Sequence, residues 1–556
     1  MERYISCDIA VANVENRVPL LPASLSPLIY PPFRAYWLAG LGANFGWLIQ
    51  MVGASWLMTQ LGGTAEQIAL VQTSVSLPIM LFALPAGALA DAVGRRRMVL
   101  VSQVFILLSS CLLAFFAWEG GLTPWALLGF TFAIGAGKAM NNPSWQTMVS
   151  ELVPRKELPT AVALNGLGFN MARSVGPAIG GILVATVGAF SAFVVNAVGN
   201  IGVVLLAMRW PRPEPRTLPP EPLGGAILTG IRYASMSIVL KRAIVRGTIF
   251  NFAAVSVMAL MPLVARDLIG GGPQTFGLLL GAFGFGAVGA AFLGPLLRRR
   301  MGLEGGVRLG FVTFAVAAAI MGLSQSAFLT LAVAFVAGGS WLITMSSFNA
   351  TVQLSSPRWV LSRALAFYQT MSFGGNALGS WVWGLVAGSF GTGSALVASA
   401  VVLLGGAAIG LVYGLRELDS DGLDPHVPWT PPVPAVDMRP TSGPIVTTVE
   451  YRIEEKDIAA FHVLMAKRRR SRTRDGARRW TLSRDLQDPQ IWYERFKTAT
   501  WVETERHHQR RTVAGARLAS ELRALHRGGE RPVVHYELVR HPDIASEWAG
   551  WETIHH

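Results

Sequence analysis

The segment GALADAVGRRR, from Gly87 to Arg97, ends a long apolar run with one carboxylate, one glycine and three consecutive arginines. A carboxylate at a helix end can accept two parallel hydrogen bonds from a guanidinium group and so hold neighbouring helices together. A contact that forms in one conformation and opens in another suits a two-state conformational change. The alternative is that the arginines only fix the orientation of the chain in a membrane. We define the candidate latch as Gly87, Asp91, Gly94, Arg95, Arg96 and Arg97.

The composition of the whole chain indicates that most of it is solvated by lipid. Of its 556 residues, 52% are hydrophobic and only 14% are charged, whereas soluble domains carry about 25% charged residues. The net charge of +14 is explained by arginines in cytoplasmic loops and in a polar terminal domain. We therefore expect the lipid bilayer, and no nucleic acid, as a partner.

Long apolar runs recur along the first three quarters of the chain. A helix needs about 20 apolar residues to cross the hydrocarbon core, and a membrane β-barrel would alternate polar and apolar residues instead. The sequence predicts an all-α polytopic membrane protein with twelve transmembrane helices, followed by a small α+β domain. The predicted spans are 34–60, 67–90, 98–118, 124–146, 158–187, 190–209, 243–268, 274–297, 305–325, 327–350, 361–389 and 392–415.

The arginines between these spans predict the orientation. They gather in the even-numbered loops, at Arg95–Arg97, Arg155, Arg298–Arg300 and Arg358. Positively charged loops stay on the cytoplasmic side. Both termini are therefore expected in the cytoplasm.

The two halves of the membrane region repeat at an offset of about 203 residues. Arg95–Arg97 maps onto Arg298–Arg300, and Gly181 maps onto Gly384. One constant spacing across separate helices predicts two parallel six-helix repeats, as in two-lobed transporters. The predicted organisation is an N-terminal tail (1–30), a first lobe (31–210), a cytoplasmic linker (211–242), a second lobe (243–416), a further linker (417–443) and a soluble α+β domain (444–556).

The latch residues resemble the loop signature of the major facilitator superfamily, although Ala92 stands where that signature has a basic residue. A second element, GPAIGG, resembles a motif that exporters of this superfamily carry in the fifth helix. It comprises Gly176, Pro177, Gly180 and Gly181. Small residues also permit ordinary close packing of helices.

The overall character of the sequence resembles one branch of this superfamily, which contains the enterobactin exporters and the transmembrane secretion effectors. This resemblance implies ion-coupled efflux of small organic molecules across a bacterial inner membrane.

Two cations lie near the middle of predicted spans, Lys138 in the fourth and Arg173 in the fifth. A charge there costs about 3 kcal/mol, which favours a functional role. Both are candidates to bind an anionic substrate, and the alternative is pairing with nearby asparagines or carbonyl groups. Further candidate substrate contacts are Asn44, Asn251, Tyr368 and Asn376. We expect no metal and no cofactor. No span carries a central carboxylate, which leaves a proton relay on such a group unsupported, and no phosphate-binding loop occurs, which argues against ATP as the direct driving force.

The region after residue 444 has the pattern βαββαβ, which is typical of a ferredoxin-like fold. It resembles antibiotic-biosynthesis monooxygenase-like domains, which implies self-association through this domain. Its His507 and His508 are interpreted as a solvated helix face or, alternatively, as pocket residues. The main hypothesis is an exporter that is not an enzyme. The alternatives are a membrane-tethered, cofactor-free monooxygenase and a sensor that transports nothing.

Overall fold

The computed structural model describes residues 23–154, 156–210, 223–357, 360–415, 434–510, 513–528 and 532–540. The chain divides into two compact units. The first unit contains the long helices of both lobes, and the second contains the C-terminal sheet with short segments of the preceding chain. The first comprises Met1–Gly224, Val239–Thr351 and Leu365–Glu417, and the second comprises Gly225–Ile238, Val352–Ala364 and Leu418–His556.

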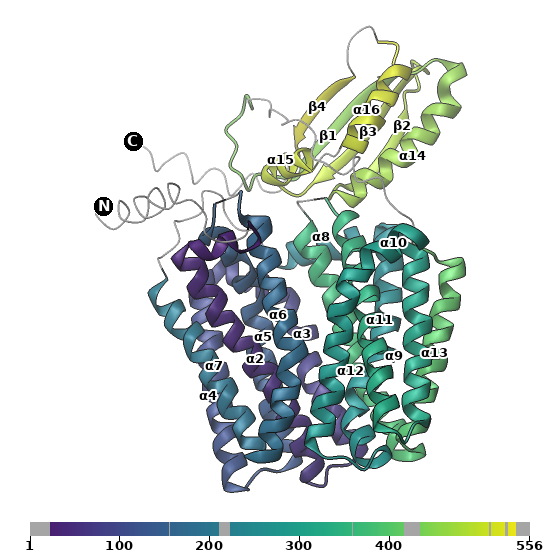
Figure 1. The fold of residues 1–556 in the computed structure, drawn as a ribbon. Helices are drawn as coiled ribbons and strands as arrows, with labels where there is room; N and C mark the ends of the chain where they lie inside the picture. Colours follow the sequence, from purple (N-terminus) through teal and green to yellow (C-terminus); the bar gives the residue numbers. More distant parts are fainter. Residues whose placement is uncertain are drawn as a thin grey trace. The chain divides into compact units, whose positions relative to one another are not determined.

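The first lobe is a bundle of long helices, drawn in purple and blue in Figure 1. Its elements are η1 (Ala23–Ile29), α2 (Pro31–Gln60), α3 (Ala65–Val93), α4 (Arg95–Glu119), α5 (Pro124–Leu152), α6 (Leu158–Thr186) and α7 (Ala189–Arg209). Local chemistry sets several of these ends. Thr123 caps α5 by accepting a hydrogen bond from the Ala126 amide, and Pro124 occupies the first turn. Gly94 separates α3 from α4 with a φ of 95°, which favours glycine.

The second lobe is a further bundle of long helices and is drawn in teal and green in Figure 1. Its elements are α9 (Ile238–Leu263), which continues into the π-helical turn η2 (Val264–Leu268), and α10 (Pro273–Leu323), α11 (Ala327–Leu354), α12 (Leu361–Phe390) and α13 (Thr392–Val412). Gly302, with a φ of 67°, interrupts α10 at a kink. Each predicted span overlaps one of the long helices, and the spans 274–297 and 305–325 share α10.

Eight helical segments in the described ranges are long and apolar enough to cross a membrane. They are Ala65–Ala86, Arg95–Glu119, Ala189–Arg209, Ile238–Leu268, Pro273–Gly294, Leu296–Leu323, Ala327–Leu354 and Thr392–Val412. The chain is therefore a multi-pass membrane protein. The long helices outside this set are α2, α5, α6 and α12.

Glycines mark two places where helices of different lobes approach each other closely. A Cβ atom on Gly181 of α6 would lie 2.8 Å from the carbonyl oxygen of Pro273 and 2.9 Å from the Cα of Gly277 in α10. A Cβ atom on Gly384 of α12 would lie 2.7 Å from the Cβ of Ala69 and 3.1 Å from the Cα of Glu66 in α3. Only glycine allows backbones to approach this closely.

The C-terminal domain folds as a four-stranded antiparallel sheet in the order β2-β3-β1-β4. This is the ferredoxin-like order that the βαββαβ pattern predicts. The elements are β1 (Ile445–Arg452), η4 (Glu455–Asp457), α14 (Ile458–Arg474), β2 (Arg478–Arg484), β3 (Ile491–Thr498), α15 (Trp501–Gln509), α16 (Val513–Leu525) and β4 (Val533–Leu538). The sequence pattern predicts one helix over 501–526, where the structure has α15 and α16.

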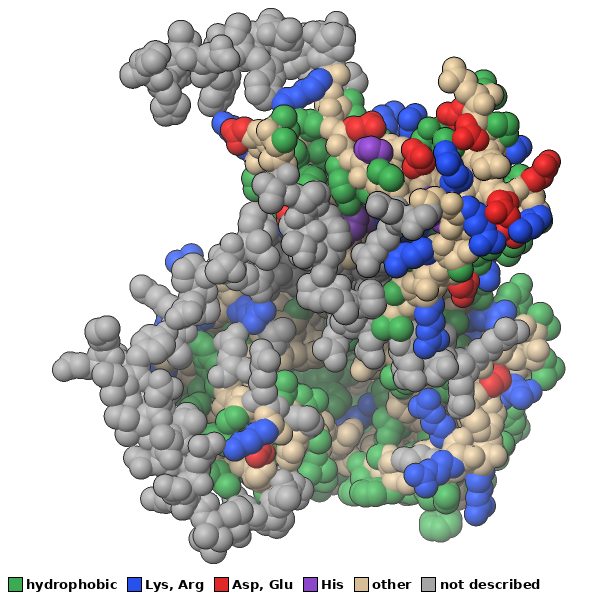
Figure 2. Space-filling model, turned by 90° about the horizontal axis from the view of Figure 1, so that it is seen from above, with side chains coloured by type: hydrophobic (Ala, Val, Ile, Leu, Met, Phe, Trp, Pro, Cys, Tyr) green, Lys and Arg blue, Asp and Glu red, His purple; other side chains and the backbone are tan. Residues whose placement is uncertain are grey.

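The C-terminal domain has an apolar core and a charged surface. Alternating residues of β1 pack with Phe461 and Met465 of α14 in an apolar core. The face of the domain visible in Figure 2 carries many Lys and Arg side chains, with Asp and Glu among them.

The same unit contains α8 (Leu223–Met236). Its Tyr233 ring contacts the Arg474 guanidinium at the end of α14, with 5.2 Å between the guanidinium carbon and the ring centre.

Candidate substrate cavity

A cavity of about 620 Å³ opens within the helical unit. Its wall comes from the first half of α2, the second half of α5 and the first half of α6, with smaller contributions from α3, α4, α7 and α12. A site of this size suits a drug-sized molecule. The polar and charged lining residues are Tyr36, Asn44, Gln103, Lys138, Asn141, Asn142, Gln146, Asn165 and Gln369.

Lys138 is the one cation among the lining residues that the structure describes. Its Nζ lies 6.0 Å from the centre of the Trp47 ring, at the outer limit of a cation–π contact. No described carboxylate lies within ion-pair distance of it. An intramembrane cation with so weak a partner is poised to bind a negative charge.

Two lining amides present oxygen atoms that have no hydrogen-bond partner among the described residues. These atoms are Oε1 of Gln103 and Oδ1 of Asn141, and both side chains are buried. Buried polar atoms without partners are rare, because each costs about 1–3 kcal/mol. A ligand that donates hydrogen bonds would satisfy both atoms. Asn44, predicted as a substrate contact, also lies in the wall.

Arg173 lies in the contact between the lobes and outside the lining residues. Its guanidinium stacks 3.9 Å from the centre of the Trp341 ring of α11 and 5.8 Å from that of Phe283 in α10. The carbonyl group of Arg173 also lies against Gly284 of α10. This cation therefore joins α6 of the first lobe to two helices of the second.

The other predicted substrate contacts lie away from this cavity. Asn251 is buried and donates to the Gly247 carbonyl at 2.8 Å and to the Met345 sulfur at 3.3 Å. Tyr368 is also buried, and its hydroxyl lies 3.9 Å from the same sulfur. The Asn376 carbonyl accepts a hydrogen bond from Ser380 in α12.

The lobes touch at the opposite end of the bundle from the cavity. There Trp381 of α12 donates to the Glu66 carboxylate of α3 at 3.0 Å, and the Thr73 hydroxyl donates to the Ala377 carbonyl at 3.1 Å. The crossings at Gly181 and Gly384 lie in the same half of the bundle. The helical unit is thus hollow in one half and closed in the other.

In the latch, the structure describes the arginines and the backbone turn. The Arg96 guanidinium donates to the carbonyl groups of Ala207 and Met208 at 3.0 and 2.6 Å. It therefore caps the C-terminal end of α7, where the helix dipole favours a cation. Gly87 and Asp91 lie in α3, and their side chains are outside the described residues.

Sequence reasoning missed a buried ion pair in the second lobe. Arg246 of α9 is 1% exposed and donates to Oε2 of Glu304 at 2.6 Å, and the Leu415 amide donates to the same oxygen at 2.7 Å. Arg308, one turn further along the helix, adds a weaker contact at 3.5 Å. Arg246 falls in an apolar run, which is the signal that would have found it.

A bundle of long apolar helices that holds a cavity with a few polar and charged lining groups suits a membrane transporter. Residues 22–542 match the family model of the transmembrane secretion effectors, so the chain belongs to this family of major facilitator transporters, which are not enzymes. The match includes the C-terminal domain.

Relatives and solved structures agree with this assignment. The multidrug efflux pump Tap of Mycolicibacterium fortuitum is 24% identical over 400 residues, 70% of this chain and 97% of that protein. The staphyloferrin A transporter of Staphylococcus aureus is 21% identical over 51% of this chain and 71% of its own length. A bacterial homologue of the lysosomal transporter Spinster has a TM-score of 0.56 at 14% identity, covering 69% of this chain and 96% of that one. The POT family transporter PepTSo has a TM-score of 0.58 at 12% identity, covering 69% of this chain and 97% of that one. These structures show the shared transporter fold.

Proposed function

We propose that this transporter exports small organic molecules from the cytoplasm by alternating access, across a bacterial inner membrane and with both termini cytoplasmic. The observation that carries the proposal is the cavity in one half of the bundle, with Lys138 and several amides in its wall, while the lobes are in contact in the other half. The cavity half carries Arg95–Arg97, which supports a cytoplasmic opening. The likeness to the efflux pump Tap supports the outward direction.

Twelve spans in two parallel six-helix repeats are part of this proposal. The support is positional: Gly181 and Gly384 lie 203 residues apart, and each fills the equivalent place in a crossing between lobes. The first crossing pairs α6 with α10, and the second pairs α12 with α3. Paired crossings of this kind suit two lobes that rock about a central axis.

We propose an anionic substrate with hydrogen-bond donors. Lys138 supplies the positive charge, and Gln103, Asn141 and Asn44 supply oxygen acceptors in the same wall. A negative charge about 6 Å from Lys138 would gain about 2–3 kcal/mol at the dielectric constant typical of protein sites. The substrate contacts predicted at Asn251, Tyr368, Asn376 and Arg173 stay predictions for a conformation in which the lobes have moved.

We propose two elements that couple transport to conformation. The latch, centred on Asp91 with Arg95–Arg97, would hold the cavity half together once the lobes close there. Glu66 is the candidate for ion coupling, because its carboxylate bridges the lobes through Trp381 at the closed end. Breaking this bridge would let the lobes separate at that end. The glycine–proline motif of α6 would guide the movement of this helix; it comprises Gly176, Pro177, Gly180 and Gly181. Self-association through the C-terminal domain stays a prediction.

Lys138→Gln is expected to reduce efflux of an anionic dye about tenfold, because the variant removes the cation from the cavity wall. The measurement is efflux of fluorescein, an anion, and of ethidium, a cation, from cells that lack their own pumps. Ethidium efflux should stay within about twofold of the wild type or rise.

Lys241→Gln is the matched control, because Lys241 is an exposed lysine at the start of α9. It should leave the efflux of both dyes unchanged. If Lys138→Gln lowers the efflux of both dyes equally at the same protein level, the anionic-substrate proposal is wrong. If the wild-type protein moves neither dye nor any other small organic probe, export itself is contradicted.

A further inference from the structure

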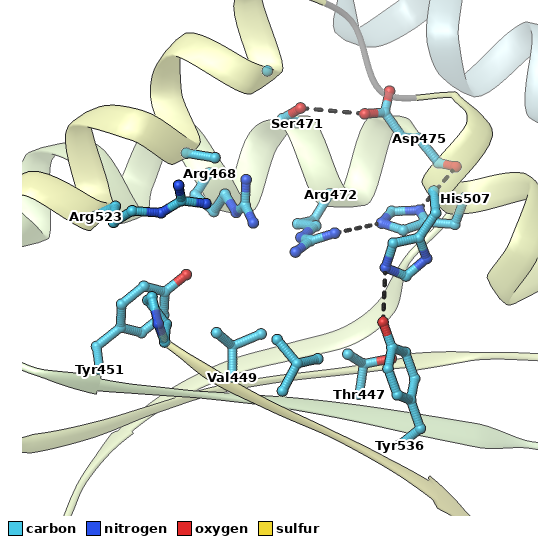
Figure 3. A pocket seen from close by; sticks show the side chains of 15 residues that line it. Thr447, Val449, Tyr451, Arg468, Ser471, Arg472, Asp475, His507, Arg523 and Tyr536 are labelled. Carbon is cyan, nitrogen blue, oxygen red and sulfur yellow. Dashed lines mark hydrogen bonds between the residues drawn. The ribbon is translucent and has the colours of Figure 1, made fainter. Parts of the chain in front are cut away.

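The C-terminal domain contains a second cavity, of about 260 Å³, between the sheet and its helices. Strands β1 and β4 form its floor, and α14, α15 and α16 form its walls, as Figure 3 shows. Its lining residues alternate along β1, where Thr447, Val449 and Tyr451 all point to the helix side of the sheet. This pocket lies outside the helical unit.

The wall of this pocket carries an excess of positive charge. Arg468 and Arg472 share one carboxylate, the fully buried Glu494, at 3.6 and 3.3 Å. Arg523 of α16 adds a third guanidinium at the rim, and no described carboxylate pairs with it. Figure 3 shows the guanidinium groups of Arg468 and Arg523 on the same side of the pocket. The arrangement favours an anion in the space that they enclose.

Both histidines belong to this pocket, so the interpretation of a solvated helix face is wrong for His507, which is 4% exposed. The Arg472 guanidinium lies 3.0 Å from Nε2 of His507. Because a guanidinium only donates, Nε2 must accept, which assigns the ring proton to Nδ1, beside the Asp475 carbonyl. Burial first, and then the Arg472 charge, hold the pKa of His507 well below its usual range. The ring therefore stays neutral and leaves the positive charge to the arginines.

The pocket also holds a buried polar atom that has no partner in the described part of the chain. Thr447 is 1% exposed, and its hydroxyl makes no hydrogen bond. Figure 3 places Thr447 near Tyr536, toward the other end of the floor from Arg523. An unpaired buried hydroxyl costs about 1–3 kcal/mol unless a ligand satisfies it. The apolar side chains of Val449 and Val534 lie in the same pocket.

We propose that this pocket binds a small organic monocarboxylate with a flat apolar body and a polar group at its far end. Arg523 and Arg468 hold the carboxylate, Val449 and Val534 contact the body, and the Thr447 hydroxyl hydrogen-bonds the far polar group. The volume, just below that typical of drug-sized ligand sites, limits the ligand to about two fused rings.

A short series of contacts connects the pocket to α8. Asp475, a lining residue, pairs with Arg474 at 3.1 Å, and Arg474 lies over Tyr233 of α8. The pocket is separate from the cavity proposed for the transported molecule, which lies in the helical unit.

The test is equilibrium dialysis of radiolabelled 6-hydroxy-2-naphthoate against the full-length protein in lipid nanodiscs. The neutral amide of the same compound tests the need for the charge. Arg523→Gln should weaken naphthoate binding about tenfold, as expected for the loss of one charge-assisted hydrogen bond. Thr447→Val, which keeps the side-chain shape, should weaken it about threefold.

Arg517→Gln is the matched control, because Arg517 is an exposed arginine on the same helix and lies outside the pocket. It should leave the affinity within about twofold. A thermal unfolding scan of each variant confirms that it is folded. The proposal is overturned if the full-length protein shows no saturable binding, if the amide binds equally well, or if Arg523→Gln binds like the wild type. Binding that is lost in Lys138→Gln but kept in Arg523→Gln would place the naphthoate in the membrane cavity, which contradicts this site while supporting the proposed transport function.

Discussion

Glu304→Gln is expected to lower the free energy of unfolding of the second lobe by about 3–5 kcal/mol, because it leaves the Arg246 guanidinium buried without a counter-charge. Glu304 also accepts the Leu415 amide, so the substitution weakens the junction between α10 and the end of α13. The measurement is the midpoint of thermal unfolding in detergent, followed by size-exclusion fluorescence. Replacing both partners, as Arg246→Met with Glu304→Leu, should cost much less than the single change, because neither buried charge remains.

The exposed pair of Arg266 and Asp267 provides the matched control. Its partners lie 2.5 Å apart, and each side chain is about 40% exposed. Asp267→Asn is expected to cost no more than about 1 kcal/mol, since solvent screens exposed pairs. If Glu304→Gln shifts the unfolding midpoint no further than Asp267→Asn, the buried pair does not stabilise the lobe as we infer.

Gly181→Val is expected to reduce transport at least tenfold, with the protein level within about twofold of the wild type. A side chain at this position would collide with the backbone of Pro273 and Gly277, and backbone atoms cannot move aside as a flexible side chain can. The closed half of the bundle could then not form. Gly384→Val should have the same effect at the related crossing, where α12 meets Glu66 and Ala69 of α3.

Gly129→Val is the control for this pair, because Gly129 of α5 is exposed and a Cβ there meets no atom within 4 Å. It should transport normally. Dye efflux and quantification of membrane-inserted protein give both readouts. Wild-type transport by Gly181→Val and Gly384→Val would mean that these crossings are not part of the transport cycle.

Much of the helical fold was predictable, because a long run of apolar residues identifies a membrane helix in the sequence. The spans matched long helices, and the 203-residue offset led from sequence to the pair Gly181 and Gly384. The ferredoxin-like strand order was likewise predictable, since βαββαβ connectivity leaves few ways to close an antiparallel sheet. The family was predictable from the latch residues and the glycine motif.

The candidate sites were predicted less completely, because the type of a residue and its depth in a helix do not determine whether its side chain faces the cavity. Lys138 and Asn44 line the cavity, whereas Arg173 at a similar depth stacks on Trp341 between the lobes. The ion pair of Arg246 and Glu304 joins residues 58 positions apart, which no local pattern reveals. The pocket around Arg468 and Arg523 depends on how α14 and α16 pack over the sheet, and this too is a tertiary property.

The central claim is that the two lobes rock, so that one half of the bundle opens as the other closes. Double electron–electron resonance tests it most directly. The method measures the distance between spin labels on two introduced cysteines, in a variant of the protein that lacks Cys7 and Cys111. One pair, Ala35 with Lys241, reports on the cavity half, and another, Gln60 with Gln325, reports on the closed half. On addition of a transported dye with an imposed proton gradient, the first distance should shorten and the second should lengthen. Two distances that stay fixed, or that change in the same direction, would contradict the account.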